Sequence, residues 1–148
     1  MKYILFNLVL LCSFSAAVAQ KKVPAKQQAI NYYLNMKNSL IVSDKESVAK
    51  GADSLLKAAN KIDGTDSIRL YAGKIAATTD INKQRAGFIL LSKLMWTMAE
   101  QMPIQKKNTV YLQVCPMTGA SWLSKEKEIR NPYYPKNMLT CGEVKGQI

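Results

Sequence analysis

Most of the chain after residue 24 has the hydrophobic spacing of helices. Residues 25–43, AKQQAINYYLNMKNSLIVS, place apolar side chains three and four positions apart, which puts them on one face of a helix. The residues on this face are Ile30, Tyr33, Leu34, Leu40 and Ile41. We therefore expect a first helix that begins near Ala25 and buries this face.

Polar residues then mark the start and end of a second helix. Ser43 and Glu46 have the spacing of a capping box, in which the serine oxygen accepts a backbone N–H and the glutamate reaches back. Gly64 can adopt the left-handed conformation that ends a helix, and Thr65 can cap the next one. The apolar face between these signals consists of Val48, Ala52, Leu55, Leu56, Ala59 and Ile62.

Two more helices follow before the pattern ends at Pro103, a residue that cannot continue a helix. The third turns Ile68, Tyr71, Ala72 and Ile75 inward; the fourth is capped by Asp80 and carries Phe88, Leu91, Met95, Met98 and Met102. Its methionines could form a metal-binding stripe, but Phe88 and Leu91 extend the same stripe, which favours a helical core. Four amphipathic helices joined by short turns predict an up-and-down bundle.

The chain changes character after Pro103. Residues 106–108 indicate a polar turn, and residues 109–114, TVYLQV, are rich in β-branched and aromatic residues, which predicts a strand. Ser124 and the alternating charges after it indicate a solvated turn of helix. Pro132, Pro135 and Gly142 make the rest turn-rich. We therefore expect a mainly α fold: a bundle of about four helices with an irregular C-terminal cap, about residues 104–148, that contains a short strand or hairpin.

The N-terminus has the layout of a secretory signal peptide. Lys2 precedes an apolar run from Tyr3 to Leu11, and residues 17–19 are Ala-Val-Ala. The apolar run is too short to span a bilayer comfortably. We expect cleavage after Ala19 rather than lipid attachment at Cys12, because the bulky Leu11 precedes that cysteine. Residues 20–148 would then form one periplasmic or otherwise exported domain without an integral membrane segment.

Composition narrows the possible functions. The chain has no histidine, which removes the usual general base and most zinc sites. It also lacks a glycine-rich phosphate loop, a nucleophile elbow and a Cys-x-x-Cys pair, so we expect no enzyme activity. The formal net charge is +11, but the lysines are spread along the whole chain. This distribution indicates a solvated surface rather than a nucleic-acid interface.

Soft donor atoms gather in the cap. Cys115 and Met117 stand two residues apart in VCPM, and Met138 and Cys141 stand three apart in MLTC. Thiolates and thioethers suit Cu(I) and Ag(I) and discriminate against harder ions. Trp122 and Tyr133 could shield such an ion, although a buried tryptophan is also a common packing anchor, and Met138 could simply pack beneath the tail.

A disulfide is the competing interpretation of the same cysteines. An exported chain meets an oxidising compartment, and joining Cys115 to Cys141 would close a loop of about 26 residues, worth about 3.5 kcal/mol in the chain-entropy model. The two interpretations stay open, since a redox-sensitive pair could bind Cu(I) when reduced and release it when oxidised.

The order of motifs in the cap resembles a known family. The segments CPM, WLS, KEI, NPY and MLTCG occur between Cys115 and Gly142 in the order found in domain-of-unknown-function family 3347. The resemblance implies an exported domain, either free-standing or attached to periplasmic adaptor subunits of heavy-metal efflux pumps. It implies such an adaptor, or another periplasmic protein, as partner. This sequence departs from the family pattern by having only four residues between Met117 and Trp122.

From the residues and the resemblance together we expect an exported protein that binds or handles Cu(I) or Ag(I) in association with heavy-metal efflux. The alternative is an exported interaction module, stapled by a disulfide, with no metal and no catalysis.

Overall fold

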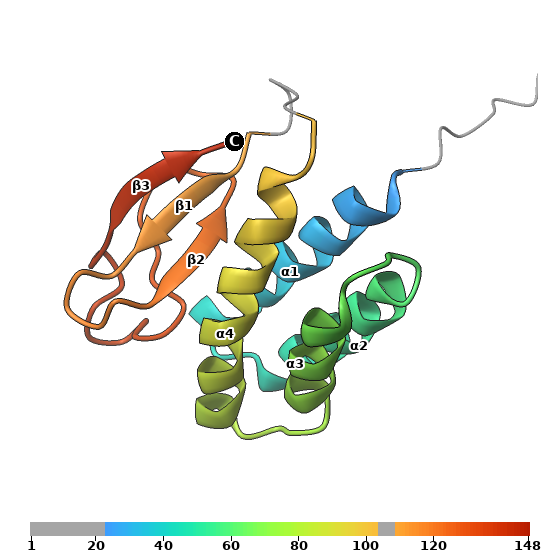
Figure 1. The fold of residues 1–148 in the computed structure, drawn as a ribbon. Coiled ribbons are helices and arrows are strands. Elements are labelled where there is room, and N and C mark those ends of the chain that lie inside the picture. Colours follow the sequence, from blue (N-terminus) through green and yellow to red (C-terminus); the bar gives the residue numbers. More distant parts are fainter. Residues whose placement is uncertain (1–22, 104–108) are drawn as a thin grey trace, which may run out of the picture.

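The structure, a computed structural model, describes residues 23–103 and 109–148. The signal peptide predicted at residues 1–19 and the polar turn predicted at residues 106–108 lie outside the described residues. Four helices and a small three-stranded sheet make up the described part (Figure 1). The expectation of a mainly α bundle with a strand-containing cap is confirmed.

The helices follow one another with short connections and pack in sequence order. They are α1 (Ala25–Ile41), α2 (Lys45–Ala59), α3 (Asp66–Ala76) and α4 (Ile81–Glu100). Each helix contacts the next along the chain, and α4 also contacts α1 and α2, which closes the bundle. No helix among the described residues is both long and apolar enough to cross a membrane.

The predicted helix boundaries are partly confirmed. Asp80 caps α4 by accepting the N–H groups of Asn82 (2.9 Å) and Lys83 (3.3 Å), as expected. The capping box at Ser43 is wrong, because Asp44 is the N-cap of α2 and accepts the N–H of Ser47 at 3.0 Å.

The turn between α2 and α3 also differs in detail from the prediction. Gly64 has φ 73°, the left-handed conformation expected of it. Thr65 stands at the N-cap of α3 but makes no side-chain cap bond there. Its hydroxyl instead bonds to the carbonyls of Ala59 (2.8 Å) and Ile62 (2.7 Å), so it closes the end of α2.

The predicted inner faces of the helices form the core. Tyr33 and Phe88 stack with ring centroids 4.7 Å apart, which joins α1 to α4. Met95 and Met98 are buried within the same apolar cluster, so the methionine stripe on α4 is packing, and Met102 is partly buried beside it. Leu56 and Tyr71 are likewise only partly buried.

The cap contains β1 (Tyr111–Val114), β2 (Ser121–Ser124) and β3 (Glu143–Gln147). They form an antiparallel sheet in the order β2-β1-β3. The strand predicted at residues 109–114 is confirmed as β1, whereas the helical turn predicted after Ser124 is wrong. Residues 125–128 instead form bends after β2. The side-chain amide of Gln113 donates to the carbonyls of residues 126–128, so these carbonyls are not available for the hydrogen bonds of a helix.

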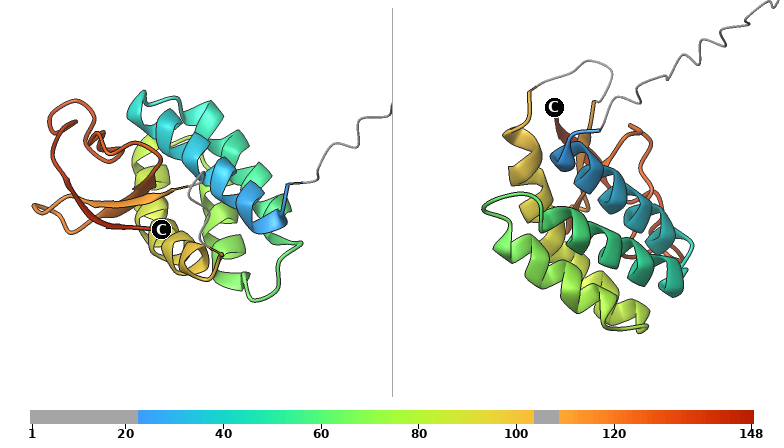
Figure 2. Two further views of the ribbon diagram at one scale, coloured as in Figure 1. Left: turned by 90° about the horizontal axis from the view of Figure 1, so that it is seen from above. Right: turned by 90° about the vertical axis from the view of Figure 1, so that its right-hand side faces the viewer.

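The sheet lies against one side of the bundle, as the view from above shows (Figure 2). Its strand β2 contacts both α4 and α1. On the bundle side, Arg85 donates to the carbonyl of Pro132 (3.0 Å) and to the carbonyl of Leu40 (3.0 Å). The cap is therefore held by hydrogen bonds as well as by apolar packing.

Candidate metal centre

Cys115 directly follows β1 and begins the turn that leads into β2. Its N–H donates to the carbonyl of Ala120 (2.9 Å), and its own carbonyl accepts the N–H groups of Gly119 (2.8 Å) and Thr118 (3.3 Å). Gly119 has φ 67°, which costs glycine little because it has no Cβ. This tight turn holds Cys115 with its side chain buried.

Cys141 reaches the same place from the opposite side of β1. Strand β3 pairs with β1 up to the pair Val114–Glu143, so the residues before β3 lie beside the residues after β1. The N–H of Cys141 donates to the carbonyl of Met138 (3.0 Å), and its carbonyl accepts the side-chain amide of Asn131 (3.1 Å). Cys141 is only partly buried, in contrast to Cys115.

The two sulfur atoms are 3.3 Å apart, and both cysteines are free thiols. Burial raises the pKa of Cys115, but hydrogen bonds from the Thr118 side chain, from Cys141 and from the N–H groups of Thr118 and Met117 outweigh burial and lower this pKa. The pKa of Cys141 is raised, chiefly by its hydrogen bond to Cys115. The two pKa values shift in opposite directions because the sulfurs share one hydrogen bond, in which either thiol can be the donor.

The predicted thioether ligands flank this pair differently. Met117 is 75% exposed, although hydrogen bonds from its backbone N–H lower the pKa of both cysteines. Met138 is partly buried and lies in the turn that also holds Cys141. The structure thus brings the two thiols together and leaves the Met117 thioether in solvent, so the part of the methionines in binding stays a prediction.

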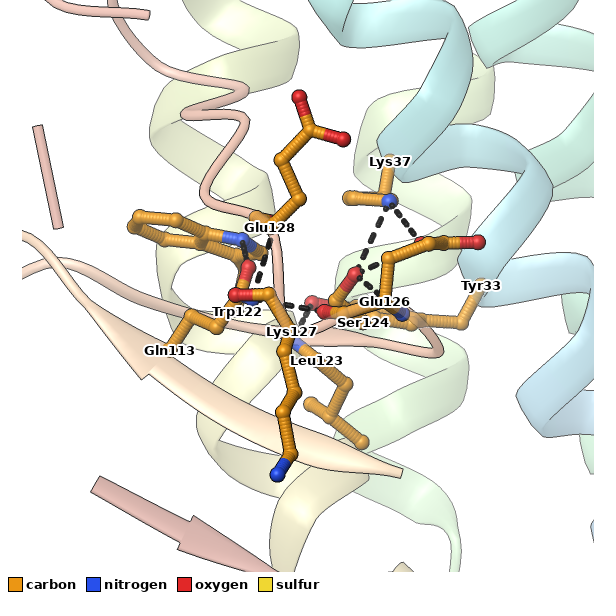
Figure 3. Close-up of polar contacts among 9 residues, drawn as sticks. All are labelled: Tyr33, Lys37, Gln113, Trp122, Leu123, Ser124, Glu126, Lys127 and Glu128. Carbon is orange, nitrogen blue, oxygen red and sulfur yellow. Dashed lines mark hydrogen bonds and ion pairs between the residues drawn. The ribbon is translucent and has the colours of Figure 1, made fainter. Parts of the chain in front are cut away.

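Trp122, predicted to shield the site, is fully buried next to the cysteine turn. Its indole N–H donates to Gln113 Oε1 at 2.6 Å, and Gln113 Nε2 donates to the carbonyls of residues 126–128, as Figure 3 shows. A Cβ added to Gly142 would lie 2.9 Å from Trp122 Cη2. The indole is therefore fixed against the residue that follows Cys141.

Tyr133, the other predicted shielding residue, packs edge-on against Trp122 with ring centroids 6.0 Å apart. Its hydroxyl donates to the carbonyl of Ser121 (2.6 Å) and lies 3.1 Å from Ser92 Oγ in α4. Tyr133 thus supports Trp122 while its polar end joins the cap to the bundle.

A buried lysine makes a further connection between bundle and cap. Lys37 of α1, with its side chain 3% exposed, donates to Ser124 Oγ and Glu126 Oε2, both at 3.4 Å (Figure 3). Burial lowers the pKa of Lys37, and the charge of Glu126 opposes this effect. The contact fixes the segment that follows β2, and with it the carbonyls that hold Gln113.

Sequence reasoning missed several residues that build the site. Gln113 carried the clearest signal, since a polar residue inside the apolar strand TVYLQV suggests a buried hydrogen bond. Thr118 and Gly142 stand next to predicted ligands, but nothing local showed that one bonds to a sulfur and the other leaves room for Trp122. Lys37 gave no signal at all among many surface lysines.

The described part of the chain contains no cluster of three or more histidine, cysteine, aspartate or glutamate side chains that could hold a metal ion. Among protein families, one described as protein of unknown function (DUF3347) matches residues 29–107. This match runs from α1 through α4 and ends before Cys115. No curated protein and no solved structure matches the chain.

Proposed function

We propose that this chain, which belongs to the protein family DUF3347, binds one soft monovalent ion, Cu(I) or Ag(I), as cargo in its cap between Cys115 and Cys141. The observation that supports this most directly is the 3.3 Å separation of two thiols presented by two separate turns. Met117 and Met138 serve as weaker, neutral donors, since both stand in those turns.

The surroundings of the thiols suit this cargo. Soft ions bind thiolates in preference to carboxylates, carbonyls or water. The hydrogen bonds that lower the pKa of Cys115 make its thiolate easier to form. Trp122 is buried beside Gly142, the residue that follows Cys141, and Tyr133 packs edge-on against Trp122, whereas Met117 is exposed.

The proposed role is to hold this ion in an exported compartment and to pass it to a heavy-metal efflux adaptor or another periplasmic protein. The signal-peptide pattern of residues 1–19 and the resemblance of the cap motifs support this setting. Cys141 is the more accessible thiol, so exchange with a partner would occur from its side.

The test is competition for Cu(I) against a chromogenic chelator under anaerobic, reducing conditions. Cys12 is replaced by alanine throughout, so that Cys115 and Cys141 are the remaining cysteines. We expect one ion per chain, near-complete loss of binding in Cys115→Ser and Cys141→Ser, and weaker binding in Met117→Leu and Met138→Leu. Met98→Leu, in the core of α4, is the control and should bind normally.

Affinity should also fall as the pH is lowered, because both ligating thiols must lose their protons to bind. A wild-type chain that takes up no ion, or a double cysteine variant that binds as well as wild type, would exclude the proposal.

The same separation of sulfurs also favours the alternative, an exported interaction module stapled by a Cys115–Cys141 disulfide with neither metal nor catalysis. Counting free thiols on protein isolated without reductant separates the two. Two free thiols per chain favour metal binding, and none favours the staple.

A further inference from the structure

The two cysteines differ in access to solvent although their sulfurs are neighbours. Cys115 has no exposed surface, whereas Cys141 is partly exposed. A disulfide compound in solution can therefore reach Cys141 but not Cys115. After attack at Cys141, the nearest sulfur is that of Cys115, 3.3 Å away before any movement.

The fold of both turns is complete without a bond between the sulfurs. Backbone hydrogen bonds close the turn at Cys115 through Gly119 (2.8 Å) and the turn at Cys141 through Met138 (3.0 Å). A disulfide needs its sulfurs at about 2.05 Å, so the two sulfur atoms must approach by a little over 1 Å. The dithiol and the disulfide can thus share one backbone.

We propose that Cys115 and Cys141 exchange reversibly with small-molecule disulfides, with Cys141 as the attacking sulfur and Cys115 as the resolving sulfur. This activity needs no metal. Because the same sulfurs are the principal ligands of the proposed function, oxidation would also release a bound soft ion, and this one consequence rests on the proposed function.

The exchange has two steps. The Cys141 thiol passes its proton to the Cys115 thiolate, 3.3 Å away, and the Cys141 thiolate so formed attacks one sulfur of a disulfide RSSR. A Cys141–SR bond forms, the RS–SR bond breaks, and RS⁻ leaves and takes up the proton held by Cys115. The Cys115 thiolate then attacks Cys141 Sγ; the Cys115–Cys141 bond forms, the Cys141–SR bond breaks, and a second RS⁻ leaves. The two protein thiols lose two electrons and two protons, and RSSR becomes two RSH.

The test uses reduced, metal-free protein in which Cys12 is replaced by alanine. The protein is exposed anaerobically to oxidised glutathione, the reaction is quenched with an alkylating agent, and the intact mass of the chain is measured by mass spectrometry. Wild type should form the internal disulfide, and excess reduced glutathione should reopen it. Cys115→Ser should accumulate one glutathione on Cys141. Cys141→Ser should react at least about tenfold more slowly, because the remaining thiol is buried.

Several outcomes would overturn the proposal. They are equal rates of adduct formation in the two single variants, a faster rate in Cys141→Ser, no internal disulfide in wild type, or a disulfide that glutathione cannot reopen. Circular dichroism of each variant shows whether it is folded, and a denatured sample gives the rate for an unprotected thiol.

Failure here is distinguishable from failure of the proposed function. If the chain binds Cu(I) but does not exchange with disulfides, only this inference fails. If it exchanges with disulfides but does not bind Cu(I), only the metal proposal fails.

Discussion

Replacing Gly142 with alanine tests the packing beside Cys141. An alanine Cβ there would lie 2.8 Å from Ile129 Cγ2, 2.9 Å from Trp122 Cη2 and 3.3 Å from the carbonyl oxygen of Val114. The first two distances are shorter than carbon atoms tolerate, since optimal contacts between carbons are about 3.5–4.0 Å. At least two groups must therefore move.

Little freedom exists to relieve this overlap. Trp122 is fully buried and its indole is held by Gln113 at 2.6 Å, and the Val114 carbonyl belongs to β1. Only Ile129, which is partly buried, can yield easily. Overpacking of this kind costs about 1–3 kcal/mol. For a domain of this size we expect the melting temperature of Gly142→Ala to fall by roughly 3–12 °C.

The matched control is Gly73→Ala. Gly73 lies inside α3, and a Cβ added there would meet nothing within 4 Å. Alanine is the better helix former, so this variant should gain roughly 0.5–1 kcal/mol. Urea denaturation of reduced protein, followed by circular dichroism, measures both changes. The packing argument fails if Gly142→Ala is as stable as wild type, or if both variants shift in the same direction.

Three further predictions concern the core, the N-cap of α4 and the N-terminus of the chain. Leu91→Ala should lower the free energy of unfolding by about 2–5 kcal/mol, because Leu91 is fully buried. The control Leu90→Ala, at the exposed neighbouring position, should change it by less than about 0.5 kcal/mol. Equal changes for the two variants in urea denaturation would contradict this packing. Hydrogen bonds from the N–H groups of Lys83 and Asn82 lower the pKa of Asp80, so its charge stabilises the fold above pH about 3.8 and this contribution is lost as the pH falls through the folded-state pKa. Melting curves of Asp80→Ala should thus show less loss of stability in acid than wild type, and identical pH profiles would refute the assignment. The intact mass of exported protein should correspond to a chain that begins at Gln20, and a mass that includes Met1 or a lipid on Cys12 would refute cleavage after Ala19.

The helices could be predicted because their signals are local. The spacing of Leu34, Leu55 and Leu91 within their own segments defines the buried faces, and Gly64 and Asp80 act on backbone groups within a few residues of themselves. The errors were local choices between neighbours. Asp44 rather than Ser43 caps α2, because Ser43 adopts a left-handed conformation, with φ 57°, in the turn that precedes the helix.

The cap could be predicted only in outline. Residues 109–114 have the composition of a strand, but β2 and β3 are short and were not distinguishable from turns. The stretch after Ser124 has charges that suit a helix. It bends instead because the side-chain amide of Gln113, 13 to 15 residues away, donates to its carbonyls.

For the candidate site, the sequence by itself determined which soft donors are available and that histidine is absent. It placed Cys115 at the end of a strand and Cys141 in a turn, 26 residues apart. Only the tertiary structure decided that β3 returns along β1, which sets the two sulfurs 3.3 Å apart, buries one thiol and leaves the other accessible. The physical reason is that strand pairing and burial depend on contacts between segments distant in the chain, whereas spacing and capping depend on neighbours.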